Sequence, residues 1–293
     1  MTLSVVIITY NEEANIGRTL KSVLPLVANG QGEIILVDSH STDRTIDIAR
    51  EHGAQIFVED WKGYAAQKNS AIAKAKGDWI FSLDADEELE ADLVGEIQKA
   101  MDNDTVPATR KPVLSPASLD AVEEVMAYEE GKVSRPEPQI NGYWIPRKNF
   151  FLGRWIRHGG FWPDYKLRLF RSGTGHIAER AVHEVITVDG PTWRLQHALL
   201  HHAYPTLSSY TGHMNRYSSL GAEMAVAEGR RGFSFLDVVI RPVATFLYKY
   251  FFRLGFLDGR EGLLLNLYHS VYVSWKYAKV WELRRGPKPT TSD

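Results

Sequence analysis

The chain has no cysteine in its 293 residues, and this absence removes several kinds of chemistry at once. It excludes disulfide bonds, zinc sites built on thiolates and cysteine nucleophiles. Any bound metal must therefore be held by oxygen or imidazole ligands, which favours hard divalent cations such as Mg²⁺ or Mn²⁺. The absence is also compatible with a reducing compartment.

The first residues lack the features of a signal peptide. The apolar run of residues 3–8 is too short, no basic residues precede it, and no small-residue cleavage site follows it. We expect a buried strand there instead. Hydrophobic residues make up 44% of the chain and charged residues 24%, which is ordinary for a globular protein with a sizeable core.

The chain has little net charge, only −2, but this charge is unevenly distributed. Residues 230–288 carry eleven Lys and Arg against four Asp and Glu, so the preceding part is acidic. The basic segment is also rich in aliphatic and aromatic residues, which argues against nucleic acid as a partner. An anionic membrane surface fits both its charge and its apolar character.

Strand-like runs alternate with helical patterns over the first ninety residues. Residues 3–9, 33–37, 55–58 and 78–83 are β-branched or apolar runs that predict strands, and residues 64–75 predict a helix. This alternation is typical of an α/β fold with a mostly parallel sheet flanked by helices. Ligands of such sheets bind beyond the carboxyl ends of the strands.

Polar residues occupy three of these strand ends, and we expect them to converge at one edge of the sheet. They are Thr9, Tyr10, Asn11 and Glu12 after the first strand, Asp38 after the second, and Asp84, Ala85 and Asp86 after the fourth. Two carboxylates one residue apart can face one divalent cation, which then bridges a diphosphate and acts as a Lewis acid on the leaving group. Tyr10 offers a flat face to a nucleotide base, and Asp38 offers an acceptor to the base or ribose.

Four stretches of the chain resemble family 2 glycosyltransferases of the GT-A fold: VVIITYNEE (5–13), ILVDSHSTDRT (35–45), GYAAQKNSAIAKAKGDWIFSLDADEEL (63–89) and VHE (182–184). Further stretches are similar to the WaaE/KdtX-like group of bacterial lipopolysaccharide inner-core glycosyltransferases: FLGRWIRHGGFWPDYKLRLFR (151–171), RAVHE (180–184), GFLDGREG (255–262) and KYAKVWE (276–282). Residues 104–139 are a departure from this pattern, and their five prolines predict a flexible insertion on the acceptor side.

The resemblance implies a GT-A type fold with a Rossmann-like sheet, and it implies roles for matching residues. Asp38 would hold the base or ribose, Lys68 and Asn69 would lie near the donor, and Asp84 and Asp86 would flank the metal and diphosphate. Glu184, beside His183, would stand where the family keeps its catalytic base. The chemistry agrees, because inverting transfer needs one carboxylate to deprotonate the acceptor hydroxyl.

Other candidates have competing explanations. Arg168 is a possible phosphate clamp. Trp155, Phe161 and Trp162 are expected to stack on acceptor sugars, although packing would explain each equally well. Asp164 is a weaker rival for the base. The histidines at 197, 201 and 202 are not expected to bind metal, since no carboxylate joins them at ligand spacing.

We expect a glycosyltransferase domain over residues 1–229, including the insertion, and a C-terminal amphipathic helical segment over residues 230–293. Polar residues recur every four positions from Asp237 to Arg253, and on a helix they form one narrow polar stripe. Two helices lying in a membrane interface would explain this pattern, and an ordinary helical hairpin packed on the body is the alternative.

Together these features predict an inverting, metal-dependent transfer of a hexose to a lipid-linked saccharide such as the lipopolysaccharide inner core. The donor would be a UDP-hexose, with UDP-glucose favoured, and the protein would sit peripherally on the cytoplasmic face of a bacterial inner membrane. Transfer to a polyprenyl phosphate and non-catalytic binding of a nucleotide sugar are the alternatives.

Overall fold

The structure is a computed structural model, and it describes residues 1–102, 139–177, 186–230 and 233–285. The expected insertion therefore lies, but for residue 139, outside the described residues. The described chain forms two compact units. Unit 1 comprises residues 1–102, 139–147, 165–177 and 186–201, and unit 2 comprises residues 148–164, 202–230 and 233–285. This division differs from the boundary expected near residue 230.

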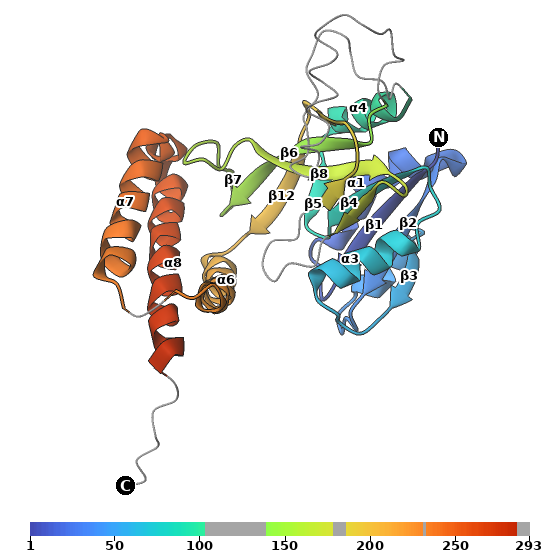
Figure 1. Ribbon diagram of the computed structural model, residues 1–293. Helices are drawn as coiled ribbons and strands as arrows, with labels where there is room; N and C mark the ends of the chain where they lie inside the picture. The colour runs from blue at the N-terminus through green and yellow to red at the C-terminus, as the bar shows by residue number, and fades with distance from the viewer. Residues whose placement is uncertain (103–138, 178–185, 231–232, 286–293) are drawn as a thin grey trace, which may run out of the picture. The chain divides into compact units, whose positions relative to one another are not determined.

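Helices and strands alternate from the first residues onward, as the sequence pattern predicts (Figure 1). The first elements are β1 (Leu3–Thr9), α1 (Ile16–Val27), η1 (Ala28–Gly30), β2 (Gly32–Asp38), α2 (Thr45–Glu51), β3 (Gln55–Val58), α3 (Tyr64–Ala73), β4 (Trp79–Asp84), β5 (Glu87–Leu89) and α4 (Ala91–Asp102). They are followed by β6 (Gly142–Phe151), β7 (Arg154–Trp155), β8 (Asp164–Arg171), β9 (Gly175–Ile177), β10 (Ile186–Val188), β11 (Thr192–Arg194) and β12 (Leu199–Tyr204).

In the described part of the chain, ten strands form one sheet with the main order β3-β2-β1-β4-β8-β6-β12-β5. The strands β3, β2, β1 and β4 are parallel, whereas β8 and β5 pair antiparallel with β4 and β12. The expected α/β class is therefore confirmed, and the sheet is mixed beyond its first four strands. This mixed part of the sheet matters for the site, because it brings late segments of the chain beside β4 and β5.

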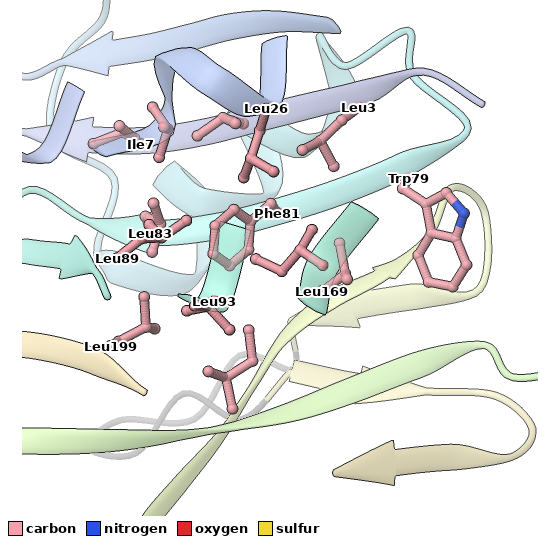
Figure 2. Close-up of a cluster of buried hydrophobic side chains, with 14 of the residues drawn as sticks. Leu3, Ile7, Leu26, Trp79, Phe81, Leu83, Leu89, Leu93, Leu169 and Leu199 are labelled. Atoms are coloured by element: carbon pink, nitrogen blue, oxygen red, sulfur yellow. The ribbon is translucent and has the colours of Figure 1, made fainter. Parts of the chain in front are cut away.

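The core follows from the period of the strands, whose successive side chains point to opposite faces of the sheet. In β1, Val5 and Ile7 pack into one buried cluster with α1 and α4, while Val6 packs into a second cluster with α3. Figure 2 shows the first cluster, in which Phe81 and Leu83 of β4 lie among leucines from other elements. Helices thus cover both faces, so the parallel strands are buried and their ends are the accessible parts.

The long helices of unit 2 are α6 (Leu207–Ala227) and α8 (Gly259–Arg285). Between them lie the short helix α7 (Arg241–Leu247), the π-helical turns η2 (Leu236–Ile240) and η3 (Tyr248–Phe252) on either side of it, and the 3₁₀ turn η4 (Gly255–Asp258). Helix α8 packs against both α6 and α7, and Thr206 and Ser209 form a capping box at the start of α6. The expected C-terminal helical segment is confirmed. Within the described ranges, none of the helices combines the length and apolar character needed to cross a membrane.

Acid is expected to destabilise unit 1 through Glu59. Hydrogen bonds from Lys74, Ser70 and Lys62 lower the pKa of Glu59 from 4.5 to about 2. Because the folded-state pKa is depressed, this stabilisation is present above pH 4.5 and is lost as the pH falls toward 2. We expect Glu59→Gln to lower the unfolding free energy by about 1–2 kcal/mol at pH 7, and by much less at pH 2.5, in urea titrations followed by circular dichroism.

The matched control is Glu51→Gln, which changes an exposed carboxylate at the end of α2. It should stay within about 0.5 kcal/mol of the unaltered protein at pH 7. An equal loss of stability for Glu59→Gln at both pH values would show that the carboxylate charge contributes nothing.

Candidate active site

The carboxyl ends of three neighbouring parallel strands meet at one edge of the sheet in unit 1. In the register of these strands Thr9 lies opposite Asp38, and Ile8 lies opposite Asp84. The residues that the sequence placed at separate strand ends are therefore neighbours across β2, β1 and β4. This is the edge at which ligands of parallel sheets bind.

Asp38 is fully buried, and its carboxylate organises the turn that follows β2. Thr9 donates its hydroxyl to Oδ1 of Asp38 at 2.9 Å, and the backbone N–H of Ser41 donates to Oδ2 at 2.7 Å. The Ser41 hydroxyl also donates to Oδ1. A buried carboxylate needs such donors, because desolvation without them costs several kcal/mol. Asp38 therefore fixes the turn at residues 39–41, and its predicted contact with a base or ribose stays a prediction.

Asn11 joins the loop after β1 to the loop after β2. Its backbone N–H donates to the Ser41 hydroxyl at 2.8 Å, and its side-chain oxygen accepts from the backbone N–H of Thr42 at 2.8 Å. Asn11 has a φ of 54°, a left-handed conformation that asparagine tolerates better than most residues. The preceding Tyr10 is 58% exposed, so its ring is open to a ligand at this edge.

Asp84, the last residue of β4, lies at the centre of an ion-pair network. Lys68 of α3 donates to its Oδ1 at 2.7 Å, and Arg168 of β8 contacts its Oδ2. Arg168 also donates to Glu87 at 2.6 Å, and Arg147 of β6 donates to the same Glu87 oxygen at 3.2 Å. The other Glu87 oxygen accepts from the backbone N–H of Asp84 at 3.1 Å. Glu87 and Arg168 are buried, so each charge depends on its partners.

The network keeps Asp84 ionised. Burial by itself raises the pKa of Asp84, but Arg168 and Lys68 together hold this pKa well below its usual range. Burial likewise disfavours the charged form of Arg168, and Asp84 and Glu87 reverse that effect and raise its pKa. Both groups therefore carry their charges at neutral pH.

Asp86 points to a different partner. Thr19 of α1 donates to the backbone carbonyl of Ala85 at 2.7 Å and so holds the turn after Asp84. Asp86 then lies with its Oδ2 3.4 Å from Nε2 of His201. Strand β12 makes this meeting possible, because His201 pairs with Glu87 in the register of β12 and β5. Burial raises the pKa of Asp86, and His201 outweighs this effect and lowers it.

Negative charge gathers on the Asp86 side of the edge. Burial raises the pKa of Glu12, and a hydrogen bond from Asn15 lowers it. The nearby carboxylates of Asp86, Asp43 and Asp84 raise this pKa again, so the net shift is upward. The oxygen of Asp86 and the imidazole of His201 are ligands that suit Mn²⁺ or Mg²⁺. Asp84 has both oxygens engaged by cationic side chains. The oxygens of Asp86 and the imidazole of His201 therefore suit a divalent cation, and Asp84 lies beside them as the anchor of Lys68 and Arg168. The metal contact predicted for Asp84 stays a prediction. In the described residues, no group of three or more His, Asp or Glu side chains is arranged to hold a metal ion.

Two residues expected at the donor have structural partners. Arg168 binds carboxylates rather than standing exposed, so its predicted phosphate contact stays a prediction. Asn69 uses both ends of its amide on the backbone of Ile177, at 2.9 and 3.1 Å. Lys68 lies beside Asp84 as expected.

Glu87, Arg147 and His201 are the members of the site that sequence reasoning missed. Glu87 follows the acidic triplet directly, so its position near the site could have been predicted from the sequence. Arg147 stands in no motif that would have predicted its place in the site. The histidines were not expected to bind metal, because no carboxylate lies at ligand spacing in the sequence. The fold brings one carboxylate, Asp86, to His201.

The predicted acceptor-side aromatics all belong to unit 2. Trp155 and Trp162 meet edge to face at 5.3 Å, and Lys148 and Arg157 lie over the Trp155 ring at 4.6 and 4.5 Å. Phe161 packs against a buried cluster of this unit. Packing accounts for these contacts, and sugar stacking stays a prediction. The proposed base, Glu184, and its neighbour His183 lie outside the described residues.

Residues 4–114 match the family model described as "Glycosyl transferase family 2". The chain is also 28% identical over 289 residues to the lipopolysaccharide core biosynthesis glycosyltransferase LpsC of Rhizobium meliloti, an alignment that covers 96% of this chain and 93% of that protein. Over residues 4–114 the chain is therefore similar to glycosyl transferase family 2. Its α/β architecture is the one that the GT-A resemblance implied.

Other relatives match shorter stretches of the chain. An uncharacterized glycosyltransferase of Rickettsia bellii is 47% identical over 96 residues, which are 33% of this chain and 31% of that protein. The glucosyl-3-phosphoglycerate synthase of Mycobacterium tuberculosis, solved with Mn²⁺, UDP and phosphoglyceric acid, is 32% identical over 30% of this chain and 34% of that one, with a TM-score of 0.28.

Proposed function

We propose that the chain is a family 2 glycosyltransferase that moves a hexose, with inversion, from a UDP-sugar to a lipid-linked saccharide. We propose UDP-glucose as the donor and the lipopolysaccharide inner core as the acceptor. The observation that carries the proposal is the convergence of Asp84, Asp86 and Lys68 with the β1 and β2 strand ends at one sheet edge. The likeness to LpsC over nearly the whole chain supports the acceptor class.

The charges at this edge suit a leaving diphosphate. A divalent cation held by Asp86 and His201 would neutralise the diphosphate and act as a Lewis acid toward it. Lys68 adds a positive charge. Its side chain is 13% exposed and is oriented by its ion pair with Asp84. The exposed ring of Tyr10 would take the nucleotide base.

We propose Glu184 as the group that receives the acceptor's proton, with His183 beside it. The acceptor oxygen forms its bond to the anomeric carbon as the bond from that carbon to the diphosphate breaks. The diphosphate leaves with the bonding electrons, and the hydroxyl proton passes to the carboxylate. Glu184→Gln keeps the shape of the side chain but cannot take the proton.

A lipid-linked acceptor places the enzyme at a membrane. We therefore propose that it works peripherally at the cytoplasmic face of a bacterial inner membrane. The basic, apolar composition of residues 230–288 supports this location.

A donor screen that measures nucleotide release tests the proposal. UDP-glucose, UDP-galactose, GDP-mannose and ADP-glucose would each be offered with Mn²⁺, with and without extracted lipopolysaccharide lacking its outer sugars. We expect release from a UDP-hexose to rise at least tenfold when this acceptor is present. If a polyprenyl phosphate stimulates release instead, the alternative acceptor is favoured. If no donor is turned over under any condition, the remaining interpretation is a non-catalytic protein that binds nucleotide sugars.

A further inference from the structure

Large apolar side chains lie exposed along the first arm of a helical hairpin in unit 2. The arm runs through η2, α7 and η3 into η4, and Figure 1 shows it beside α8, on which it packs. Leu236 is 68% exposed and Phe252 is 79% exposed. We define the apolar face by Phe235, Leu236, Val243, Tyr248, Phe251 and Phe252, each of which is exposed. A soluble helical hairpin would bury such residues and turn its polar stripe to water.

Part of the polar stripe of this arm is engaged by unit 2 itself. Asp237 pairs with Arg241 at 2.7 Å and with Arg230 at 3.1 Å, and its side chain is 18% exposed. Lys249 donates to the backbone carbonyl of Gly159 at 3.2 Å and lies over the Phe161 ring at 4.3 Å. Two members of the stripe therefore face unit 2, whereas Arg241, which is 50% exposed, and Arg253 lie at the surface among the exposed apolar side chains.

Positive charge exceeds negative charge in the part of the chain that carries the apolar face. Residues 233–285 contain eight Lys and Arg against four Asp and Glu. Arg253 follows Phe252 directly, Arg260 begins the next helix, and both are exposed. Among the residues that the structure describes, no acidic side chain forms an ion pair with either arginine. Exposed arginines beside aromatic side chains match the boundary of a bilayer, where lipid phosphates lie next to acyl chains.

Charge complementarity decides between two kinds of occupant. A second copy of the chain would bring the same arginines toward Arg253 and Arg260, and like charges repel. A bilayer rich in anionic lipid supplies both an apolar layer and negative phosphates. Charged residues interrupt the apolar sequence of the arm, and this favours an arm that lies in the plane of the membrane–water interface over one that crosses the bilayer.

We propose that the apolar face of unit 2 docks on an anionic lipid bilayer, with Phe251 and Phe252 among the acyl chains and Arg253 and Arg260 against lipid phosphates. This inference deepens the proposed function, on which it rests for the lipid-linked acceptor. It names the surface by which the enzyme reaches that acceptor.

Vesicle binding tests the proposal without requiring catalysis. The full chain would be sedimented with vesicles of phosphatidylglycerol and phosphatidylethanolamine, and separately with phosphatidylcholine alone, at 50 and 500 mM salt. We expect at least tenfold tighter binding to the anionic vesicles at low salt, and weaker binding at high salt. Each of Arg253→Gln and Arg260→Gln should weaken binding about fivefold.

Phe252→Ser tests the apolar contribution, and we expect it to weaken binding about tenfold or more. Val58→Ser is the matched control, because Val58 is also exposed but lies on β3 of unit 1. Unchanged circular dichroism and urea midpoints would show that each variant is folded. Since the altered side chains are exposed, we expect the fold to persist.

The outcomes separate this inference from the proposed function. A chain that turns over donor but does not sediment with anionic vesicles overturns the docking surface alone. A chain that binds vesicles through these residues but never turns over donor overturns the glycosyltransferase proposal alone. Self-association in sedimentation velocity that Phe252→Ser abolishes, without vesicle binding, would assign the apolar face to a second copy and overturn the proposal.

Discussion

Replacing Asp86 by asparagine is expected to lower the rate of donor turnover by about 100-fold or more, the largest loss among single changes at the described site. Asparagine keeps the shape of the side chain but removes the charge that faces His201 at 3.4 Å. A 100-fold loss corresponds to about 2.7 kcal/mol of transition-state stabilisation, similar to the loss of one preorganised donor at a developing oxyanion. The measurement is steady-state nucleotide release with the donor that the screen identifies.

A second readout connects the Asp86 effect to the divalent cation. The Mn²⁺ concentration for half-maximal activity should rise in Asp86→Asn and also, by a smaller factor, in His201→Gln. Asp92→Asn is the matched control, because Asp92 is an exposed carboxylate in the first turn of α4. Equal activity and equal Mn²⁺ response in all variants would mean that Asp86 is an ordinary turn residue.

Replacing Glu87 by alanine is expected to lower the free energy of unfolding by about 3–5 kcal/mol, the largest loss of stability that we predict. Glu87 is fully buried and accepts from Arg168 at 2.6 Å and Arg147 at 3.2 Å. Its removal takes from Arg168 one of the two carboxylates that it contacts, and from Arg147 the carboxylate that it contacts at 3.2 Å. Urea unfolding at pH 7, followed by far-ultraviolet circular dichroism, measures the change.

The neighbouring residue provides the control for Glu87. Glu88 pairs with Arg18 at 3.4 Å, but both side chains are about one-third exposed, so Glu88→Ala should cost no more than about 1 kcal/mol. Similar losses for the two variants would show that burial does not strengthen the Glu87 contacts. If Glu87→Ala does not fold, Glu87→Gln offers a milder test, since it retains an acceptor for the backbone N–H of Asp84.

Stability and chemistry are coupled through this network. The same Glu87 side chain binds the Asp84 backbone and the arginine that contacts the Asp84 carboxylate. The turn that presents Asp86 therefore begins at Asp84, whose backbone N–H is bound by Glu87 and whose carboxylate is bound by Arg168. A buried network of this kind is expensive to break, and it keeps the acidic turn in one geometry.

The parallel half of the fold was predictable from local patterns. The β-branched runs that predicted strands at residues 3–9, 33–37 and 55–58 correspond to β1, β2 and β3, and the helix expected from residue 64 corresponds to α3. Side-chain alternation and helical spacing are local properties of the sequence. The rule that parallel strands present their carboxyl ends on one side then predicted that Thr9, Asp38 and Asp84 would meet.

The C-terminal arm shows where such patterns become ambiguous. Spacing every four residues from Asp237 to Arg253 predicted one polar stripe, and this stripe fits either an interfacial helix or a packed hairpin. The period of a helix does not say which of its sides meets the rest of the protein. The contacts of Lys249 with Gly159 and Phe161 supply that information.

By itself, the sequence determined the α/β class, the helical end of the chain and the acidic triplet at the end of β4, because each depends on residues close together in the chain. Only the tertiary structure decided the partners of that triplet. Arg168 reaches Asp84 across 84 positions of sequence, and His201 reaches Asp86 because β12 pairs with β5. Long-range strand pairing brings these charges together, and their separation along the chain leaves no local pattern to read.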